Sequence, residues 1–541
     1  MDKKNSRIYL EIQSHRKNPY GVLRTSYREN GKVKHKNFGR LTGIGMDKLK
    51  LLRAAFQDEA IAKGDPNALK LLNSKEYGAS AAGIKLARNL GLHQAIYSKP
   101  EEQWVKDSLA MIVGRLIYQG SKLSLSQIHE QSCLWELSGI KGHVDVETHC
   151  YDVMDKLYKR KDIIEKNLAD KHLEKGCVVL YDISSSYMEG EYAESELVQY
   201  GYSRDRKRGY AQIVVGLVTN NEGCPIGVEV FPGNTKDSST VIPKIKDIKE
   251  KYGIEDIVFV GDRGMTVGQK FTEIQSEGVS VISALSHQQM QDLLKRDVIQ
   301  LGMFDKQNIV EVYDPEREGI RYCLCQNPDT AAREAKTRNA LIEKTKEELD
   351  KIQLSTRKGS DTKMAARVGK ALSKYKAGKY FDWEVKDKTL TYSLREDMIQ
   401  KETSLDGCYI IVTDVNEKIM LKQEVVEAYK QLAFVETAFR NLKTVQLEIR
   451  PVYHKNDNRI KAHVFICMLA YYLQWHFRRR LSSLLDKDGK GKNRKWTFHH
   501  IIETLKAIRS QRVLLNNIPF NQITELTENQ LNIITLLNIK I

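Results

Sequence analysis

Residues 177–182 read Cys-Val-Val-Leu-Tyr-Asp, and residues 256–262 read Asp-Ile-Val-Phe-Val-Gly-Asp. Each segment is a short apolar run that ends in a carboxylate, which predicts a strand buried in the centre of a sheet. If the two strands are neighbours, Asp182 and Asp262 lie side by side at one edge of the sheet, where the ligands of mixed α/β sheets gather. These two segments decide both the predicted fold and its candidate site.

The surrounding segments predict the rest of one domain. Two further strands, over residues 210–218 and 226–231, precede an amphipathic helix over residues 238–252. A helix from about Thr266 and a fifth strand over residues 279–284 complete the set. Three antiparallel strands, a helix, and then strand–helix–strand is the order of the RNase H-like fold. We therefore predict an α/β protein with an RNase H-like core.

Two carboxylates held close together repel each other and titrate as a coupled pair unless a cation neutralises them. Ligation by oxygen atoms alone suits Mg²⁺ or Mn²⁺. Two such ions about 3.5–4 Å apart can activate an attacking hydroxyl group and stabilise the leaving oxygen of a phosphoryl transfer. Such a site needs a third carboxylate, from another element that reaches the same edge.

A long helix, predicted from Asn416 to Lys443 with Asn416 as its N-cap, supplies the third candidate. Tyr429, Glu436 and Lys443 are spaced by seven residues, so they share one stripe of this helix. Arg440, four residues after Glu436, lies on the same side. A carboxylate beside a cation and a phenol suits a metal site that faces a phosphate. Taken alone, the stripe favours a surface helix with a Glu436–Arg440 ion pair, because such pairs are common.

The spacing Tyr429-x6-Glu436-x6-Lys443 resembles the Tyr-x2-Arg-x3-Glu-x6-Lys signature of DDE-type, cut-and-paste insertion-sequence transposases. In that family a β-rich insertion precedes the glutamate. Other stretches resemble further blocks of the family in the same order along the chain, and together they cover most of it: Phe38–Leu41, Tyr181–Glu189, Gly201–Arg206, Pro225–Asp237, Val260–Met265, Arg450–His454 and Arg459–His463.

The resemblance implies a DNA transposase that cleaves insertion-sequence ends and transfers the cut strand into target DNA. Asp182, Asp262 and Glu436 would be the catalytic residues and the ligands of Mg²⁺, for which Mn²⁺ can substitute. Water would attack at the transposon end, and the freed 3′-hydroxyl would then attack target DNA. Double-stranded DNA, as terminal inverted repeats and as target, would be the partner, and synapsis of two ends suggests a dimer on DNA.

The resemblance also implies contacts with DNA phosphates. Tyr429 and Lys443 carry the signature positions, but Leu432 stands where the signature has arginine. Whether Lys430 or Arg440 covers the same phosphate stays open. Arg263, beside the second aspartate, is a further candidate for a DNA contact or a structural one.

The remaining sequence predicts an order of parts along the chain. A basic hairpin with an Asn-Gly turn, residues 29–31, marks the N-terminus. Helical spacing follows it, and strand-like pieces and a charged helical hairpin interrupt the core. The predicted parts are a basic β-element (1–60), a helical region that binds DNA ends (61–170), the first part of the RNase H-like core (171–290), an inserted β-rich and helical domain (291–415), the second part of the core (416–481) and a C-terminal helical region (482–541).

The net charge of +16 is concentrated in two regions. Residues 1–60 hold 14 Lys and Arg against 6 Asp and Glu, and residues 474–512 hold 11 against 3. Concentrated positive charge suits a phosphate backbone, because binding releases condensed counterions. The aromatic and basic runs Trp475–Arg480 and Lys490–Trp496 fit contacts with DNA or a solvated surface equally well.

The composition excludes several other classes. The 8 cysteines are scattered without a Cys-x2-Cys pair, which argues against a zinc site or a disulfide framework. The first residues contain no apolar leader, and the longest apolar run, Val464–Leu473, is too short to cross a bilayer. We expect a cytoplasmic, nucleoid-associated bacterial protein. His454 and His463 are predicted to be structural.

Two rival interpretations remain from sequence. The first is an RNase H-like nuclease that hydrolyses DNA without strand transfer. The second is a non-enzymatic DNA-binding protein derived from a transposase, although all three carboxylates are present.

Overall fold

The computed structural model describes residues 8–14, 18–29, 31–56, 69–204, 207, 209–236, 238–254, 257–262, 269–305, 308–355, 359–445, 447, 449–485, 496–515 and 518–541. Contacts divide the chain into two compact units. We call Glu165–Arg440 the sheet unit, and Met1–Ile164 together with Asn441–Ile541 the helical unit. Helix α8 (Lys161–His172) begins in one and ends in the other.

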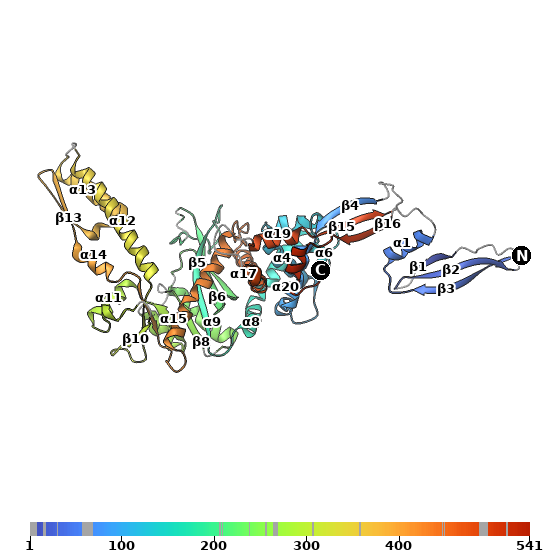
Figure 1. Cartoon of the computed structure of the whole chain (residues 1–541), viewed down its shortest axis with the longest axis horizontal. Coiled ribbons are helices and arrows are strands. Elements are labelled where there is room, and N and C mark those ends of the chain that lie inside the picture. The colour runs from blue at the N-terminus through green and yellow to red at the C-terminus, as the bar shows by residue number, and fades with distance from the viewer. Residues whose placement is uncertain are drawn as a thin grey trace. The chain divides into compact units, whose positions relative to one another are not determined.

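An eight-stranded mixed sheet forms the centre of the sheet unit, with strand order β10-β11-β14-β9-β8-β5-β6-β7 (Figure 1). Strands β5, β6 and β7 pair antiparallel, whereas β8 pairs parallel with both β5 and β9. All five strands predicted between residues 177 and 284 are present. The strands are β5 Cys177–Tyr187, β6 Gln212–Asn220, β7 Pro225–Pro232, β8 Ile257–Gly261, β9 Ser280–Ala284, β10 Val310–Tyr313, β11 Arg321–Gln326 and β14 Cys408–Thr413.

The apolar runs form central strands because both faces of the sheet are covered. Every residue of β6 and β8 is buried. Helix α9 (Ser238–Tyr252) has the predicted bounds, and its Val241, Ile245 and Ile248 are fully buried. Helix α10 (Gln269–Ser276) lies between β8 and β9 in the chain. This central burial fixes the positions of the strand ends that matter for the site.

Strand β5 differs from its prediction, which ended it at Asp182. The strand continues to Tyr187, because residues 182–187 stay paired with β6 after the pairing with β8 has stopped at Tyr181. Asp182 therefore lies within β5, at the end of its parallel pairing only.

The segment between β9 and the last helices of the sheet unit contributes to two structures. Strands β10, β11 and β14 extend the main sheet beyond β9. The helices and the β-hairpin between β11 and β14 form a separate lobe, which we call the hairpin lobe (Figure 1). The elements of this segment are α11 His287–Lys295, η3 Leu301–Met303, α12 Pro328–Gln353, α13 Asp361–Tyr375, η4 Gly378–Tyr380, β12 Phe381–Lys386, β13 Thr389–Leu394 and α14 Glu396–Thr403.

The hairpin lobe is better packed than its charged sequence suggested. Leu349, Val368 and Leu390 are among the residues of a hydrophobic core shared by α12, α13 and the β12–β13 hairpin. At its base, the Arg338 guanidinium donates to both oxygens of Asp406, at 2.7 and 2.6 Å. Such a two-pronged pair fixes geometry as well as charge, so the lobe is firmly joined to β14.

The prediction of a single helix from Asn416 to Lys443 is wrong. The segment forms α15 (Lys422–Lys430), α16 (Leu432–Arg440) and the π-helical turn η5 (Asn441–Val445). Asn416 does not cap a helix, because its side chain accepts the Lys418 N–H at 2.9 Å in a preceding turn.

The helical unit is built around the buried helix α17 (Asp457–Arg480), which packs against α4 and α7. Among the described residues no helix, α17 included, has the length and apolar character needed to cross a bilayer. The other helical elements are α1 Met46–Phe56, α2 Gly78–Asn89, α3 Leu92–Ile96, α4 Gln103–Tyr118, α5 Lys122–Gln127, η1 Ile128–Glu130, α6 Leu134–Leu137, η2 Glu147–Tyr151, α7 Asp152–Lys159, α18 Ser482–Leu485, α19 Phe498–Lys506 and α20 Glu528–Leu537.

Two small sheets belong to the helical unit. The predicted N-terminal β-element is present as the antiparallel sheet β1-β2-β3. The second sheet, β16-β15-β4, was not predicted, since residues 61–170 and 482–541 were expected to be helical. Strand β4 and the β15–β16 hairpin come from opposite ends of the chain, so no local pattern reveals the pairing of β4 with β15. The strands are β1 Tyr9–Gln13, β2 Tyr20–Glu29, β3 Lys32–Leu41, β4 Leu69–Glu76, β15 Arg509–Leu515 and β16 Ile518–Ile523.

Gly216 in β6 provides a test of the packing around β5. A Cβ atom there would collide with the hydroxyl of the buried Tyr181. We expect Gly216→Ala to lower the free energy of unfolding by about 1–3 kcal/mol, the usual cost of overpacking a core. Tyr181→Phe removes the colliding oxygen, so the same substitution should cost less in that background. Urea denaturation followed by circular dichroism measures both.

Gly39→Ala in β3 is the matched control, because an added Cβ meets nothing within 4 Å there. Its effect should stay within about 0.5 kcal/mol. The proposed collision would be contradicted if Gly216→Ala lowered the free energy of unfolding equally in the wild type and in the Tyr181→Phe background.

Candidate active site

The register of β5 and β8 brings the two aspartates together. Tyr181 and Gly261 are the last partners of this parallel pair, so Asp182 and Asp262 are the next residues along the two strands. Neighbouring strands lie about 4.8 Å apart. Asp182 is partly buried and Asp262 is exposed.

Helix α16 brings Glu436 to the same place. Its Val435, Ala438 and Phe439 are buried, and the helix packs on β5 and β6. Gly223, in the turn between β6 and β7, allows this approach, because a Cβ there would lie 2.7 Å from the Cβ of Phe434. Glu436 follows the buried Val435 and is exposed.

All three carboxylates line one cavity of about 740 Å³ in the sheet unit. The β5–β8 edge and α16 form one part of its wall, and the segment between β9 and α15 forms much of the rest. The lining residues are Asp182, Asp262, Ala284, Leu285, His287, Met290, Asn327, Thr330, Arg333, Glu334, Gly407, Cys408, Tyr409, Tyr429, Lys430, Leu432, Ala433 and Glu436.

The surroundings of Asp182 disfavour its charged form. Burial, together with the negative charges of Asp262 and Glu436, raises the pKa of Asp182 to about 6. The Ile183 N–H, which donates to Asp182 Oδ1 at 2.8 Å, and the positive charge of Arg204 act in the opposite direction. Without a bound cation, ionisation of Asp182 is therefore less favourable than that of an aspartate in water.

The donor set fits a hard divalent cation. Three carboxylates offer only oxygen atoms, which are the ligands that Mg²⁺ and Mn²⁺ prefer. A divalent ion would also offset the repulsion that raises the Asp182 pKa. The cavity is large enough to admit a further ligand beside such an ion.

The predicted DNA-contacting residues are divided among several places. Tyr429 and Lys430, at the end of α15, line the cavity. Leu432, where the resembled signature has arginine, also lines it and brings no charge. Arg440 is exposed at the end of α16 and is not among the lining residues.

Two further candidates lie elsewhere. Lys443 is on η5, which belongs to the helical unit. Arg263 falls outside the described residues, so its expected role stays a prediction.

Sequence reasoning missed the part of the cavity wall that comes from α11 and α12. His287 and Met290 come from α11, and Thr330 and Arg333 come from the first turns of α12. No local motif marks these residues, because they reach the cavity only through the fold of the segment between β9 and α15.

Arg204 was also missed as an individual residue. It lies in the Gly201–Arg206 block, whose resemblance to the family was the signal available in the sequence. The Arg204 backbone N–H donates to Ser185 Oγ at 3.0 Å, and its charge favours the ionised form of Asp182.

His454 and His463 belong to the helical unit and are not among the residues that line the cavity. His463 is buried, and one ring nitrogen lies 3.0 Å from the Ile449 carbonyl oxygen. Burial and the charges of Lys122 and Arg115 lower the pKa of His463, and burial lowers that of His454 to about 4.

The basic run at the end of α17 is partly engaged within its own unit. The Arg479 guanidinium lies 5.1 Å from the Trp475 ring centroid, and Arg480 donates to the Leu537 carbonyl oxygen at 2.6 Å. In the second run, residues 490–495 lie outside the described residues.

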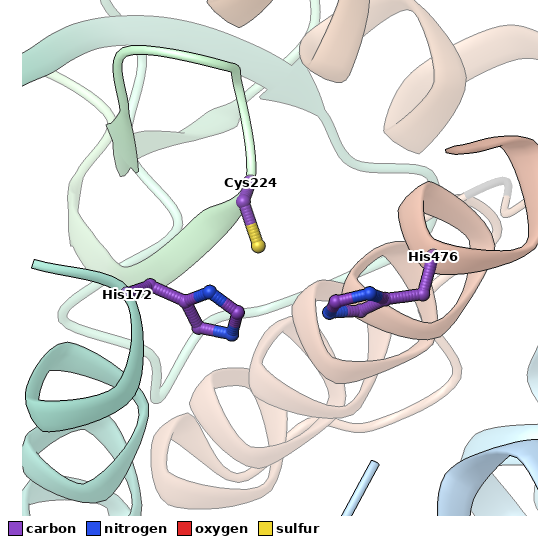
Figure 2. Close-up of side chains that lie close together, drawn as sticks. All are labelled: His172, Cys224 and His476. Atoms are coloured by element: carbon purple, nitrogen blue, oxygen red, sulfur yellow. The ribbon is translucent and has the colours of Figure 1, made fainter. Parts of the chain in front are cut away.

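Figure 2 shows a second set of side chains that could donate to a metal. His172 ends α8, and Cys224 precedes β7 in the sheet unit; their donor atoms lie within 4.8 Å of each other. Two donors fall short of the four that a structural zinc site uses. His476, drawn in the same figure, belongs to α17 of the other unit. We assign no metal to this pair.

Comparisons with known proteins identify the family. No curated protein matches the chain. Among solved structures, the cryo-EM structure of a piggyBac transposase synaptic complex with hairpin DNA is similar at 9% identity, covering 79% of this chain and 76% of that one. Its TM-score of 0.37 is too low to carry an argument. A family model described as "Transposase DDE domain" matches residues 173–473, more than half of the chain and the stretch that contains Asp182, Asp262 and Glu436. The chain belongs to the transposase DDE domain family.

Proposed function

We propose that this chain is a DNA transposase that cleaves DNA at the ends of an insertion sequence and joins the cut strand to target DNA. The observation that carries the proposal is the gathering of Asp182, Asp262 and Glu436 around one cavity. Membership of the transposase family supports it independently.

The fold supports the same proposal. Strands β7-β6-β5-β8-β9 have the order expected of an RNase H-like core, with three antiparallel strands and two that run parallel to the central one. We propose that this core is interrupted between β9 and α15 by an inserted region. Glu436 would return to the core from beyond that insertion on α16.

Divalent ions are in general use in this family, and Mg²⁺ is the ion that we propose here, with Mn²⁺ as a substitute. Asp182, Asp262 and Glu436 would hold it. When bound, it would supply a Lewis acid that activates the attacking oxygen and stabilises the leaving oxygen.

The chain's own side chains would position the DNA. Lys430 and Arg333 are the Lys and Arg side chains among the residues that line the cavity, and they would hold phosphate oxygens. The hydroxyl group of Tyr429 would donate a hydrogen bond to an oxygen of a neighbouring phosphate. Arg204 would help to keep Asp182 ionised at neutral pH. The partner would be double-stranded DNA, and the protein would act in the bacterial cytoplasm. Two copies of the chain would bind the two ends of the insertion sequence as a dimer.

Removing one ligand tests the catalytic assignment. Asp182→Asn, Asp262→Asn and Glu436→Gln should each reduce DNA cleavage in Mg²⁺ by on the order of 10³-fold, since metal stabilisation of a transition state is worth several kcal/mol. Strand cleavage and joining are measured on gels with labelled duplexes that carry the insertion-sequence end.

Glu427→Gln is the matched control, because Glu427 is an exposed carboxylate of α15 that does not line the cavity. It should cleave like the wild type. Cleaved ends without joined product would identify a nuclease instead of a transposase. DNA binding by the wild type without any cleavage in Mg²⁺ or Mn²⁺ would reject the enzymatic proposal.

The raised pKa of Asp182 predicts a pH-dependent stability in the absence of metal. Because its folded-state pKa is about 6, above the ordinary value for Asp, the stability due to the protonated form is complete below about pH 4. That stability is lost as the pH rises through 6. In EDTA, Asp182→Asn should therefore be more stable than the wild type at pH 7.5, by up to about 3 kcal/mol, and the difference should shrink towards pH 4.5.

Thermal melts between pH 4.5 and 7.5 measure this difference. Millimolar Mg²⁺ should raise the melting temperature of the wild type at pH 7.5 and leave that of Asp182→Asn nearly unchanged, because ligand binding to the folded state is stabilising. Parallel pH profiles for the two proteins would show that Asp182 does not bear the predicted charge repulsion.

A further inference from the structure

The N-terminal sheet of the helical unit has one covered face and one open face. Strands β1, β2 and β3 pair antiparallel in that order, and α1 packs against β1 and β2 (Figure 1). Gly21 lies on the covered face, because a Cβ there would meet Leu10 of β1 and Leu49 of α1. Leu10 and Leu49 are both buried. Since side chains alternate along a strand, the register determines which residues lie on the opposite face.

We call that opposite face the open face. Residues that are paired across two strands share a face of the sheet. Because side chains alternate between the two faces, the residues of the open face point away from α1. The open face comprises Tyr9, Glu11 and Gln13 of β1, Tyr20, Val22, Arg24, Ser26 and Arg28 of β2, and Val33, His35, Asn37 and Arg40 of β3. Of these, Val22 is buried beneath its neighbours.

Side-chain contacts agree with this assignment. The Arg24 guanidinium lies 5.8 Å from the Tyr9 ring centroid, and that of Arg40 lies 5.7 Å from the Tyr20 ring centroid. The Tyr9 hydroxyl lies 2.7 Å from Ser26 Oγ, which is itself 2.9 Å from a ring nitrogen of His35. Aromatic rings thus support the arginines, which limits the side-chain entropy lost when they bind a partner.

The β2–β3 hairpin of this sheet is rich in basic residues. Residues 20–41 contain six Lys and Arg and one acidic residue, Glu29. Arg24 is paired with Glu11 on the open face, but Arg28 is exposed on the same face. On β3, Arg40 is exposed and lies on the open face, whereas the exposed Lys32, Lys34 and Lys36 lie on the opposite face by the same register. The exposed arginines of the open face are complementary to a phosphate backbone.

The dimensions favour duplex DNA over other polyanions. Each strand of the β2–β3 hairpin has 10 residues, which corresponds to about 33 Å. The major groove is about 12 Å wide and admits a two-stranded β-ribbon. Arginine side chains on the face of such a ribbon can reach both base edges and phosphates in the groove.

We propose that the open face of the β1-β2-β3 sheet binds duplex DNA in the major groove, with Arg28 and Arg40 as its principal contacts. The proposal rests on the proposed function only in that the preferred duplex would be the end of the insertion sequence. It assigns DNA recognition to a module separate from the cavity that bears the carboxylates.

The test compares full-length variants in EDTA by fluorescence anisotropy with two labelled duplexes, an insertion-sequence end and a random sequence of equal length. Arg28→Ala/Arg40→Ala should weaken binding to the end duplex by about 10- to 100-fold. Arg28→Lys/Arg40→Lys keeps the charge but not the planar fork, so it should bind both duplexes while losing most of the preference for the end.

Lys48→Ala/Arg53→Ala is the matched control, because it removes the same charge from exposed positions of α1 behind the sheet. It should change the affinity by less than about 3-fold, as expected for charges that make no direct DNA contact. Circular dichroism melts confirm that each variant is folded.

The inference is overturned if the open-face alanine variant binds the end duplex like the wild type, or if the α1 variant loses as much affinity. Tighter binding of single-stranded DNA than of duplex also overturns it. The failure of the proposed function looks different: a wild type that binds duplex DNA through the open face but never cleaves it in Mg²⁺ leaves this inference standing.

Discussion

The parallel pairing of β5 with β8 is the constraint on which the candidate site depends. It makes Tyr181 and Gly261 partners and therefore forces Asp182 and Asp262 to be neighbours. A slip of one residue would move one of the carboxylates to the other face of the sheet. The slip is resisted by strands that are buried on both faces, since all residues of β6 and β8 are buried. The sheet thus holds together two charges that repel each other.

The third carboxylate shows why the site needs the whole sheet unit. Glu436 follows Asp262 by 174 residues and reaches the cavity on a helix whose position is fixed by apolar packing on β5 and β6. The chain between them does more than connect. Three of its strands extend the sheet, and residues at the start of α11 and α12 form another part of the cavity wall. The Arg338–Asp406 pair then ties the hairpin lobe to the strand that contributes Cys408 and Tyr409 to the same wall.

The sequence predicted what local pattern encodes and missed what distant pairing decides. The apolar runs ending at Asp182 and Asp262 and the period of α9 revealed the central strands and one helix with its bounds. The continuation of β5 to Tyr187 depends on β6, and β15 pairs with a strand more than 400 residues earlier, so neither was visible locally. Strand ends and family resemblance both pointed to Asp182 and Asp262, whereas Glu436 was predicted from the resemblance, since its helix stripe alone favoured a surface ion pair. Arg333 and His287 were not found, because only the fold of the segment between β9 and α15 brings them to the cavity.

Leu432 stands where the family signature has arginine, and the structure shows how the cavity still receives positive charge. The signature arginine would stand at the first residue of α16, and Leu432 does line the cavity there without charge. Positive charge reaches the cavity from other elements instead: Lys430 ends α15, and Arg333 comes from α12. A phosphate needs a cation within reach, and it does not matter which element carries the cation. On the proposed function, Arg333 of α12 would therefore supply part of a phosphate contact that the signature places on the glutamate-bearing helix. Loss of this contact would weaken the positioning of DNA and leave the three carboxylates in place.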